Sequence, residues 1–263
     1  MRHAVVTGAA AGIGKAIAAS FAADGFRVTL VDRDTAGLEA HAAELAGSTG
    51  MVHQVVADLR EDGAAERVIA AAWSNAPIDV LVCAAGVYPA TPFLELDSAT
   101  WNLVQDLNTR APIMLTVELA KRAISEGTKP NVVTISSGAA LRARPGAAPY
   151  STSKAALESA SKAAALELGE YGIRVNVVAP GFIVVEGQAN PLSDEYVEAV
   201  SVNPLGRKGQ PSDIAQAVRW LASDAAEWVT GAVIRVDGGA STGTNQLPLH
   251  WHEPVITGTR EES

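Results

Sequence analysis

Residues 3–14 read HAVVTGAAAGIG, and this stretch decides the fold of the 263-residue chain. The apolar run from His3 to Val6 predicts a short buried strand, and the residues from Gly12 to about Ala23 predict an amphipathic helix. Between them, Gly8 permits a tight turn, while Gly12 and Gly14 let a ligand and the strand approach the backbone closely. A strand, a glycine-rich turn and a helix in this order place helix-terminal N–H groups where they bind a pyrophosphate. The alternative is a loop of small residues that binds nothing.

The same alternation of strand and helix patterns continues to the end of the chain. Further apolar strands are predicted at 27–31, 51–56, 80–83, 131–135, 174–178 and 233–236. Helices are predicted at 38–45, 64–73, after Asp97, after Pro112, at 150–171, near 195–200 and from Pro211. Strands that alternate with helices predict an α/β fold: one Rossmann-type, doubly wound parallel sheet of about seven strands. Ligands bind at the carboxyl ends of such strands, and five flagged residues fall there: Gly8, Asp32, Asp58, Gly86 and Ser137.

Composition bounds the class of protein. Hydrophobic residues make up 48% of the chain and charged residues 19%, which is typical of a globular domain. The formal net charge of −9 argues against a nucleic-acid partner, which needs a basic surface. No apolar run is long enough to span a membrane, and we expect no signal peptide before the first strand. The single cysteine, Cys83, is typical of a reducing compartment, so we expect a cytoplasmic protein in which Cys83 is a small core residue.

Residues 145–154, PGAAPYSTSK, carry the candidate chemistry. Tyr150 and Lys154 are four residues apart in a predicted helix, so their side chains lie on one face. An ammonium beside a phenol stabilises the phenolate and is expected to lower the pKa of the phenol, which makes an acid/base pair. The pair alone is a common helical spacing.

Asp32 ends the second predicted strand, 20 residues after Gly12. A carboxylate there accepts hydrogen bonds from the ribose hydroxyls of an adenine dinucleotide and repels a 2′-phosphate, so it favours NAD over NADP. Arg33 opposes this preference, because an arginine at that place binds a 2′-phosphate. Asp32 as a helix cap or turn residue is the other interpretation.

With these motifs in order, the chain resembles the short-chain dehydrogenase/reductase family, in its single-domain branch. The motifs are Thr7 to Gly14, Asp58, Asn108, Ser137, Tyr150 with Lys154, Pro180-Gly181 and Asp237-Gly238-Gly239. Ser137 lies 13 residues before Tyr150, as the family pattern expects. The resemblance covers His3 to about Ser241 and implies a domain at 1–241 followed by an extension at 242–263 that is disordered or packs on a neighbouring subunit.

The resemblance implies roles for four catalytic residues. Tyr150 would be the general acid/base, and Lys154 would lower its pKa and bind the nicotinamide ribose. Ser137 would hold the substrate oxygen, and Asn108 would fix a water that links Lys154 to solvent.

The resemblance also implies a set of cofactor-binding residues. Asp58 would contact the adenine, and Ile183 would offer backbone groups to the carboxamide. The full set is Gly8, Ala11, Gly12, Ile13, Gly14, Asp32, Arg33, Asp58, Leu59, Ala84, Ala85, Gly86, Tyr150, Lys154, Pro180, Gly181 and Ile183. No metal is expected, because the pair His250 and His252 lacks further ligands nearby.

Two positions within the motifs depart from the family pattern. Ala84 stands where the family has the second asparagine of Asn-Asn-Ala-Gly, so the turn must be held by another group. Val185 stands where a threonine often bonds the carboxamide.

The implied function is hydride transfer between NAD(H) and a secondary alcohol or ketone, in a homotetramer. The alternatives are an NADPH-dependent 3-oxoacyl thioester reductase and, from another class, a scaffold that binds NAD without turnover. Specificity is expected in residues 182–204, Tyr88–Phe93 and Ala139–Ala148. In the last of these, Leu141, Ala143 and Ala147 favour an apolar pocket, whereas Arg142 and Arg144 favour an acidic substrate. Trp101 and Trp220 are expected to face the core.

Overall fold

The computed structural model describes residues 1–47, 51–185 and 194–243, and the account below is of these residues. Residues 244–263 of the predicted extension, which include its two histidines and Trp251, lie outside them, as does Glu186 in the long loop. No helix of the described chain is long and apolar enough to cross a membrane.

Seven parallel strands form one sheet in the order β3-β2-β1-β4-β5-β6-β7. The strands are β1 (His3–Thr7), β2 (Arg27–Asp32), β3 (Val52–Val56), β4 (Val80–Cys83), β5 (Asn131–Ile135), β6 (Arg174–Pro180) and β7 (Val233–Val236). The order reverses between β1 and β4, which lie side by side with Thr7 opposite Cys83. This reversal opens a crevice at the carboxyl ends, as expected for a doubly wound sheet. The prediction of a Rossmann-type single domain is confirmed.

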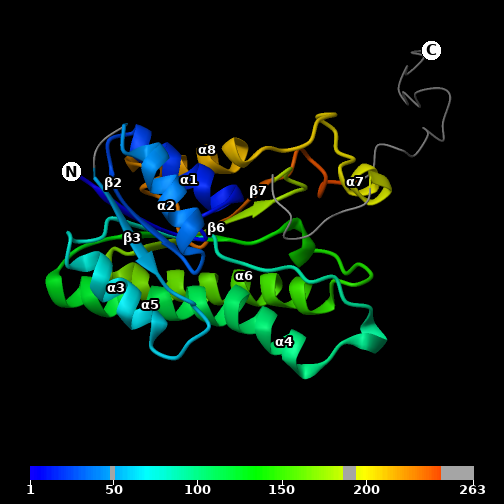
Figure 1. Cartoon of the computed structure of the whole chain (residues 1–263), viewed down its shortest axis with the longest axis horizontal. Helices are drawn as coiled ribbons and strands as arrows, with labels where there is room; N and C mark the ends of the chain where they lie inside the picture. The colour runs from blue at the N-terminus through cyan, green and yellow to red at the C-terminus, as the bar shows by residue number, and fades with distance from the viewer. Residues whose placement is uncertain (48–50, 186–193, 244–263) are drawn as a thin grey trace, which may run out of the picture.

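The helices cover both faces of this sheet (Figure 1). They are α1 (Gly12–Ala23), α2 (Thr35–Leu45), α3 (Ala64–Trp73), α4 (Ser98–Gln105), α5 (Ala111–Glu126), α6 (Ala148–Leu168), α7 (Asp194–Val200) and α8 (Pro211–Leu221). In Figure 1, α1, α2 and α8 lie above the sheet, and α3, α4, α5 and α6 lie below it. The helix α7 lies at the right, away from the N-terminus at the left.

The central strands are buried on both faces because helices cover both. In β1, Val6 packs into the apolar cluster under α1 and α8, and its neighbour Val5 packs into the cluster against α3 and α5. This alternation follows from the two-residue period of a strand. The run His3–Thr7 is fully buried, which explains why it shows no alternation of polar residues.

Some boundaries and one burial prediction differ from the structure. Helix α2 begins at Thr35, three residues before the predicted start, because the Asp34 carboxylate accepts a hydrogen bond from the Gly37 N–H at 3.1 Å and caps it. Trp101 and Trp220 are 36% and 42% exposed, so the expectation that they face the core is wrong. On α8 the buried stripe is Ile214, Ala215, Val218 and Leu221, and Trp220 lies off it.

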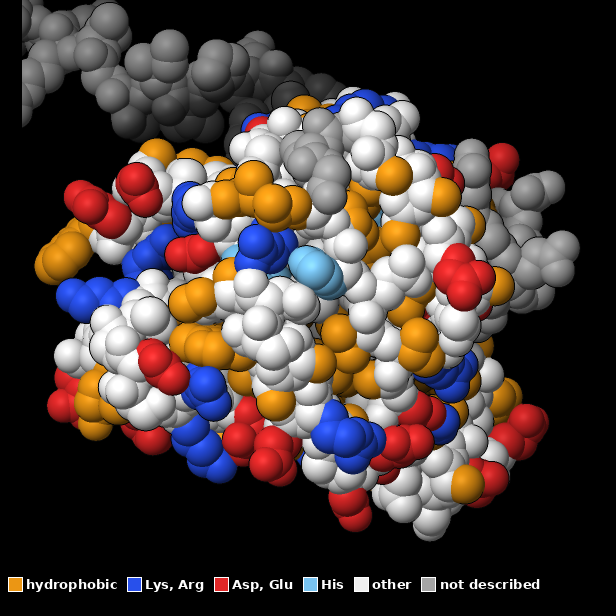
Figure 2. All heavy atoms as spheres, turned by 60° about the vertical axis from the view of Figure 1, so that its left-hand side comes forward, with side chains coloured by type: hydrophobic (Ala, Val, Ile, Leu, Met, Phe, Trp, Pro, Cys, Tyr) orange, Lys and Arg blue, Asp and Glu red, His pale blue; other side chains and the backbone are white. Residues whose placement is uncertain are grey.

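One lateral face of the molecule is shown in Figure 2. Basic and acidic side chains are intermixed over it, with hydrophobic side chains between them, and no continuous basic band crosses the described part of this face.

Candidate active site

Tyr150 and Lys154 lie on the first turns of α6, which begins at Ala148 with Pro149 in its first turn. Proline suits that place because its missing N–H has no intrahelical partner there. The Lys154 Nζ lies 5.8 Å from the centroid of the Tyr150 ring, so the expected juxtaposition is present. Lys154 is buried and donates a hydrogen bond from Nζ to the Ile135 carbonyl oxygen at 2.8 Å.

Ser137 lies two residues beyond the end of β5, close to Tyr150. Its Oγ accepts a hydrogen bond from the Ala139 N–H at 3.1 Å, which caps the 3₁₀ turn Gly138–Ala140. The hydroxyls of Ser137 and Tyr150 share a hydrogen bond. The structure therefore brings together the two hydroxyls that the sequence pairs at a distance of 13 residues.

The pKa of Tyr150 differs from expectation. Burial raises it, and the hydrogen bond from Ser137 and the positive charge of Arg144 oppose this rise without overcoming it. Ser137 and Arg144 are the groups that act to lower the pKa of this phenol here, and the lowering by Lys154 stays a prediction. Burial also lowers the pKa of Lys154 itself to about 8, since a charged ammonium is poorly solvated there.

Asn108 lies in a π-helical turn, Asp106–Arg110, between α4 and α5. Its Oδ1 accepts from the Val87 N–H at 2.9 Å, and its Nδ2 donates to the Val87 carbonyl at 2.9 Å and to the Ser153 Oγ at 3.1 Å. A methyl group built on Gly86 would lie 3.2 Å from Asn108 Oδ1 and 3.6 Å from Lys154 Nζ. Asn108 and Lys154 thus converge on Gly86, where a methyl group would be tight against the Asn108 side chain.

The glycine-rich turn fits a dinucleotide phosphate. Helix α1 begins at Gly12, and no side chain caps its N-terminus, so the N–H groups of its first turn are available to a phosphate. Gly8 has φ of +69° and its missing Cβ would lie 2.8 Å from the backbone of Ala85, so the turn packs tightly against the segment after β4. Close contacts therefore connect the glycine-rich turn at the α1 N-terminus with the catalytic candidates. They run through Ala85 and Gly86 to Lys154.

Thr7 resolves the first departure from the family pattern. Its Oγ1 accepts hydrogen bonds from the Ala84 and Ala85 N–H groups at 3.1 and 3.2 Å. This hydroxyl holds the turn that lacks the family's asparagine. Sequence reasoning missed this role of Thr7, because the bonded groups are 77 and 78 residues away.

Asp32 lies at the end of β2, beside the glycine-rich turn. Its carboxylate accepts hydrogen bonds from the Ala10 and Asp34 N–H groups, both at 3.1 Å. Asp32 is therefore a turn residue, as the second interpretation expects. A role toward a ribose stays a prediction, since a carboxylate has further acceptor positions.

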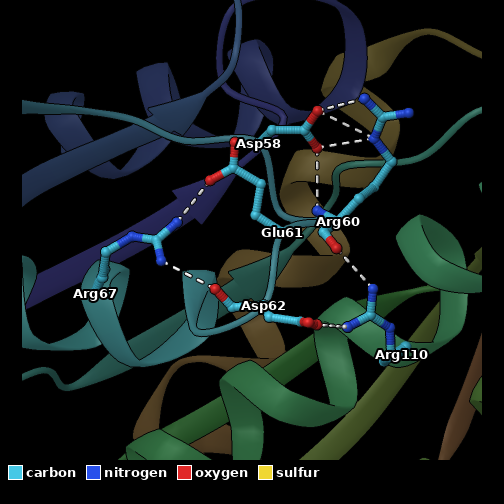
Figure 3. Close-up of polar contacts among 6 residues, drawn as sticks. All are labelled: Asp58, Arg60, Glu61, Asp62, Arg67 and Arg110. Atoms are coloured by element: carbon cyan, nitrogen blue, oxygen red, sulfur yellow. Dashed lines mark hydrogen bonds and ion pairs between the residues drawn. The ribbon is translucent and has the colours of Figure 1, made fainter.

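Asp58 follows β3 and is held by Arg60 (Figure 3). The Arg60 Nε donates to both carboxylate oxygens at 2.9 and 3.0 Å, and Nη2 also contacts Oδ2. These bonds from Arg60 lower the pKa of Asp58 to about 2. The positive charge of Arg33 also acts on Asp58. The contact of Asp58 with an adenine stays a prediction. Leu59, the next residue, is buried.

The segment after β6 closes the other side of the crevice. A methyl group on Gly181 would lie 2.7 Å from the Cα of Asp237, so β6 and the end of β7 meet here. Ile183 forms a parallel bridge with Gly209. A methyl group on Gly12 would lie 3.1 Å from a side-chain carbon of Val185. Val185, the second departure from the family pattern, therefore packs close to the glycine-rich turn.

Three further side chains gather at Tyr150. The rings of Tyr88 and Tyr150 lie 4.6 Å apart, and the Arg144 guanidinium lies 5.4 Å from the Tyr88 centroid. Tyr88 shares a hydrogen bond with Tyr196 of α7. All three side chains lie in segments that the sequence marks for specificity: Tyr88 in 88–93, Arg144 in 139–148 and Tyr196 in 182–204.

The described residues offer neither a metal site nor a reactive thiol. No group of three or more histidine, cysteine, aspartate or glutamate side chains is arranged there to hold a metal ion. Cys83 is buried beside these residues, and burial raises its pKa to about 12, which fits a core residue better than a nucleophile.

Comparisons with known proteins agree with this arrangement. The model of a family described as enoyl-(acyl carrier protein) reductase matches residues 8–241. Galactitol 2-dehydrogenase (L-tagatose-forming) of Cereibacter sphaeroides is 36% identical over 90% of this chain and 93% of its own. A 3-oxoacyl-[acyl-carrier-protein] reductase of Synechocystis sp. is 34% identical over 90% of this chain and 95% of its own.

Solved structures share the whole fold. A 4-hydroxyisoleucine dehydrogenase complexed with NADH and succinate superposes with a TM-score of 0.82 at 32% identity, covering 91% of this chain and 100% of that one. A protein described as a short chain dehydrogenase/reductase family protein superposes with the same TM-score at 34% identity, covering 92% and 98%. Similarity over nine-tenths of the chain, in both sequence and sheet order, leaves one assignment: the protein belongs to the short-chain dehydrogenase/reductase family and is an oxidoreductase that acts on CH–OH groups with a nicotinamide cofactor.

Proposed function

We propose that the protein transfers a hydride between NAD(H) and a secondary alcohol or ketone, with Tyr150 as general acid/base. The observation that carries the proposal is the hydrogen bond between the Tyr150 and Ser137 hydroxyls, with buried Lys154 one helical turn away. This group stands at the carboxyl ends of the strands, next to an uncapped helix N-terminus. A proton-transfer group beside a dinucleotide site is what alcohol oxidation requires.

In the oxidative direction, a secondary alcohol loses a proton from oxygen and a hydride from carbon and becomes a ketone. The bound nicotinamide supplies the acceptor for the hydride and its electron pair. Tyr150, as the phenolate, takes the hydroxyl proton and becomes the neutral phenol, and the Ser137 hydroxyl donates a hydrogen bond to the substrate oxygen as negative charge develops on it. Lys154 places a positive charge on the same side, and Asn108 fixes the loop at Val87 and the start of α6.

NAD is proposed as the cofactor, with NADP as the alternative. Asp32 lies at the end of β2, where a carboxylate repels a 2′-phosphate. The similar 4-hydroxyisoleucine dehydrogenase holds NADH, which supports the same choice here. Arg33 argues for NADP, because an arginine beside the Asp32 position binds a 2′-phosphate. Its charge also helps to lower the pKa of Asp58.

The second candidate is an NADPH-dependent 3-oxoacyl thioester reductase. It is favoured by the matched family description and by the similar reductase of Synechocystis sp.. The same Ser137, Tyr150 and Lys154 would serve it, so cofactor and substrate decide between the two.

A spectrophotometric assay tests the proposal. The wild type and Tyr150→Phe are compared on a panel of secondary alcohols, ketones and 3-oxoacyl thioesters, with NAD(H) and NADP(H) in parallel. We expect turnover with NAD and a secondary alcohol, and a loss of about 10³-fold in the variant, because the proton acceptor is removed. Tighter binding of NADPH than NADH, with thioester reduction, would favour the second candidate. Equal inactivity of both proteins would favour a scaffold that binds NAD without turnover.

Three further features stay proposals. The division into a domain at 1–241 and an extension at 242–263 rests on the family pattern. The homotetramer is supported by an apolar groove between α5 and α6, taken up below. A cytoplasmic location is supported by the lone, buried cysteine.

A further inference from the structure

Arg144 is a basic side chain beside the catalytic candidates that the proposed mechanism does not use. It lies in the loop between the 3₁₀ turn after Ser137 and the start of α6. Its guanidinium lies 5.4 Å from the centroid of the Tyr88 ring, and that ring lies 4.6 Å from the ring of Tyr150. A small molecule that contacts Tyr150 therefore needs a chain of only a few carbon atoms to reach Arg144.

Arg144 has no acidic partner among the described residues. No ion pair joins it to a carboxylate there, and its Nε is buried without a hydrogen-bond partner. Arg60 and Arg207, by contrast, are bound to Asp58 and Asp213, although Arg27 also has a buried Nε without a partner. A buried guanidinium donor without an acceptor costs free energy, and a bound anion removes that cost.

The neighbours of Arg144 favour a ligand over a structural partner. The Arg144 guanidinium lies over the Tyr88 ring, and a guanidinium stacked on a ring keeps the N–H donors of its edge for another group. Its charge acts on the phenols of both Tyr88 and Tyr150, so it is directed toward the proposed site. By contrast, Arg142 is exposed and donates to the Ala240 carbonyl at 2.9 Å.

We propose that the substrate is a short hydroxy acid or oxo acid, whose carboxylate is bound by Arg144 while its alcohol or carbonyl oxygen lies at Tyr150 and Ser137. A carboxylate matches the planar fork of a guanidinium through two parallel hydrogen bonds. The Tyr88 ring contacts both Arg144 and Tyr150 and suits the short carbon chain between the two ends. This inference rests on the proposed oxidoreductase function and names the class of its substrate.

The test compares acids with their neutral amides. The probes are 3-hydroxybutanoate, 4-hydroxypentanoate and 5-hydroxyhexanoate, each with its primary amide, together with 2-pentanol. For wild type, Arg144→Gln, Arg144→Lys and Arg142→Gln, the readout is the ratio of kcat/KM for the acid to that for its amide. We expect a wild-type ratio of about 10 to 100 for one chain length, carried mainly by KM.

Substitution of Arg144 should abolish this preference for the acid over its amide. The ratio should approach one in Arg144→Gln and be partly restored in Arg144→Lys, which keeps the charge without the fork. The control Arg142→Gln should retain the wild-type ratio. A ratio that persists in Arg144→Gln overturns the inference, and so does an equal loss on acids and amides accompanied by a lowered melting temperature, which indicates a structural role.

A binding measurement makes the result independent of turnover. Calorimetry of the NADH-loaded protein with 4-oxopentanoate and 4-oxopentanamide should show the acid binding more tightly, and Arg144→Gln should remove the difference. If wild type oxidises 2-pentanol but prefers amides to acids, this inference fails while the proposed function stands. If no alcohol is oxidised with either cofactor, the proposed function fails, and the calorimetric comparison still decides whether Arg144 binds a carboxylate.

Discussion

Lys154 shows what burial does to a single catalytic candidate. Its ammonium lies in the interior, 5% exposed, with one carbonyl acceptor, the oxygen of Ile135. Burial lowers its pKa from the usual 10.5 to about 8, and Cys83 opposes this weakly. The charge that the proposed chemistry uses is therefore held at a cost to stability.

This cost predicts a pH dependence of stability. Between the folded pKa near 8 and the unfolded pKa near 10.5, the unfolded chain binds more protons at Lys154 than the folded one. The contribution of Lys154 to the free energy of unfolding therefore increases as pH rises through that window. The increase is about 2 kcal/mol between pH 7 and pH 10. Urea unfolding of wild type and Lys154→Met at several pH values measures it.

The variant isolates the effect of this lysine from other titrations. Its stability relative to wild type should decrease steadily from pH 7 to pH 10, because wild type loses the buried charge. Lys162→Met, an exposed lysine of the same helix, controls for the loss of a lysine side chain. The same pH trend in both variants would contradict the argument.

At the scale of elements, the π-helical turn between α4 and α5 connects the two halves of the candidate site. Asn108 in this turn bonds the loop after β4 at Val87 and the start of α6 at Ser153. Arg110, at its end, donates to the Arg60 carbonyl at 2.6 Å and to Asp62 at 3.4 Å, as Figure 3 shows. Single π-helical turns inside longer helices often mark functional sites, since they redirect side chains.

Asn108→Ala should therefore impair turnover more than folding. The substitution leaves the Val87 N–H and carbonyl without their partners, and we expect a loss of about 1–3 kcal/mol in the free energy of unfolding. We expect kcat to fall at least about tenfold, because Gly86 and Lys154 lose a fixed neighbour. Denaturant unfolding and steady-state kinetics measure the two effects.

Asn102→Ala is the matched control for this variant, since Asn102 is exposed on the adjoining α4. It should leave both quantities near wild type. If Asn108→Ala lost stability but kept kcat, Asn108 would be a structural residue only.

At the scale of the whole molecule, α5 and α6 form an apolar outer surface. A groove of 410 Å³ runs between them, lined among others by Ile113, Val117, Ala160, Ala163 and Ala164. Small residues on a helix let another helix approach closely, and an exposed apolar patch of this kind marks an interface. This surface supports the proposed homotetramer through pairing of α5 and α6 with the same helices of a second copy.

Ala163→Glu should reduce the size of the assembly. Ala163 is exposed on α6 and lines the groove, so a carboxylate there enters the proposed interface without disturbing the core. We expect light scattering after gel filtration to report a tetramer for wild type and a smaller species for the variant. Ala40→Glu, at an exposed alanine of α2 in the opposite layer, should remain tetrameric. Identical masses for wild type and Ala163→Glu would exclude this surface as the interface.

The sequence by itself determined the elements, their order and the identity of the candidate catalytic side chains. The turn at Gly8–Gly14, the strand ends and the helical spacing of Tyr150 and Lys154 are local patterns, and local geometry fixes what they form. The tertiary structure decided what depends on neighbours distant in sequence. Thr7 holds Ala84 and Ala85, and burial reverses the expected pKa shift of Tyr150. Such contacts could not be read from the sequence, because burial and electrostatic environment exist only once the strands and helices have packed together.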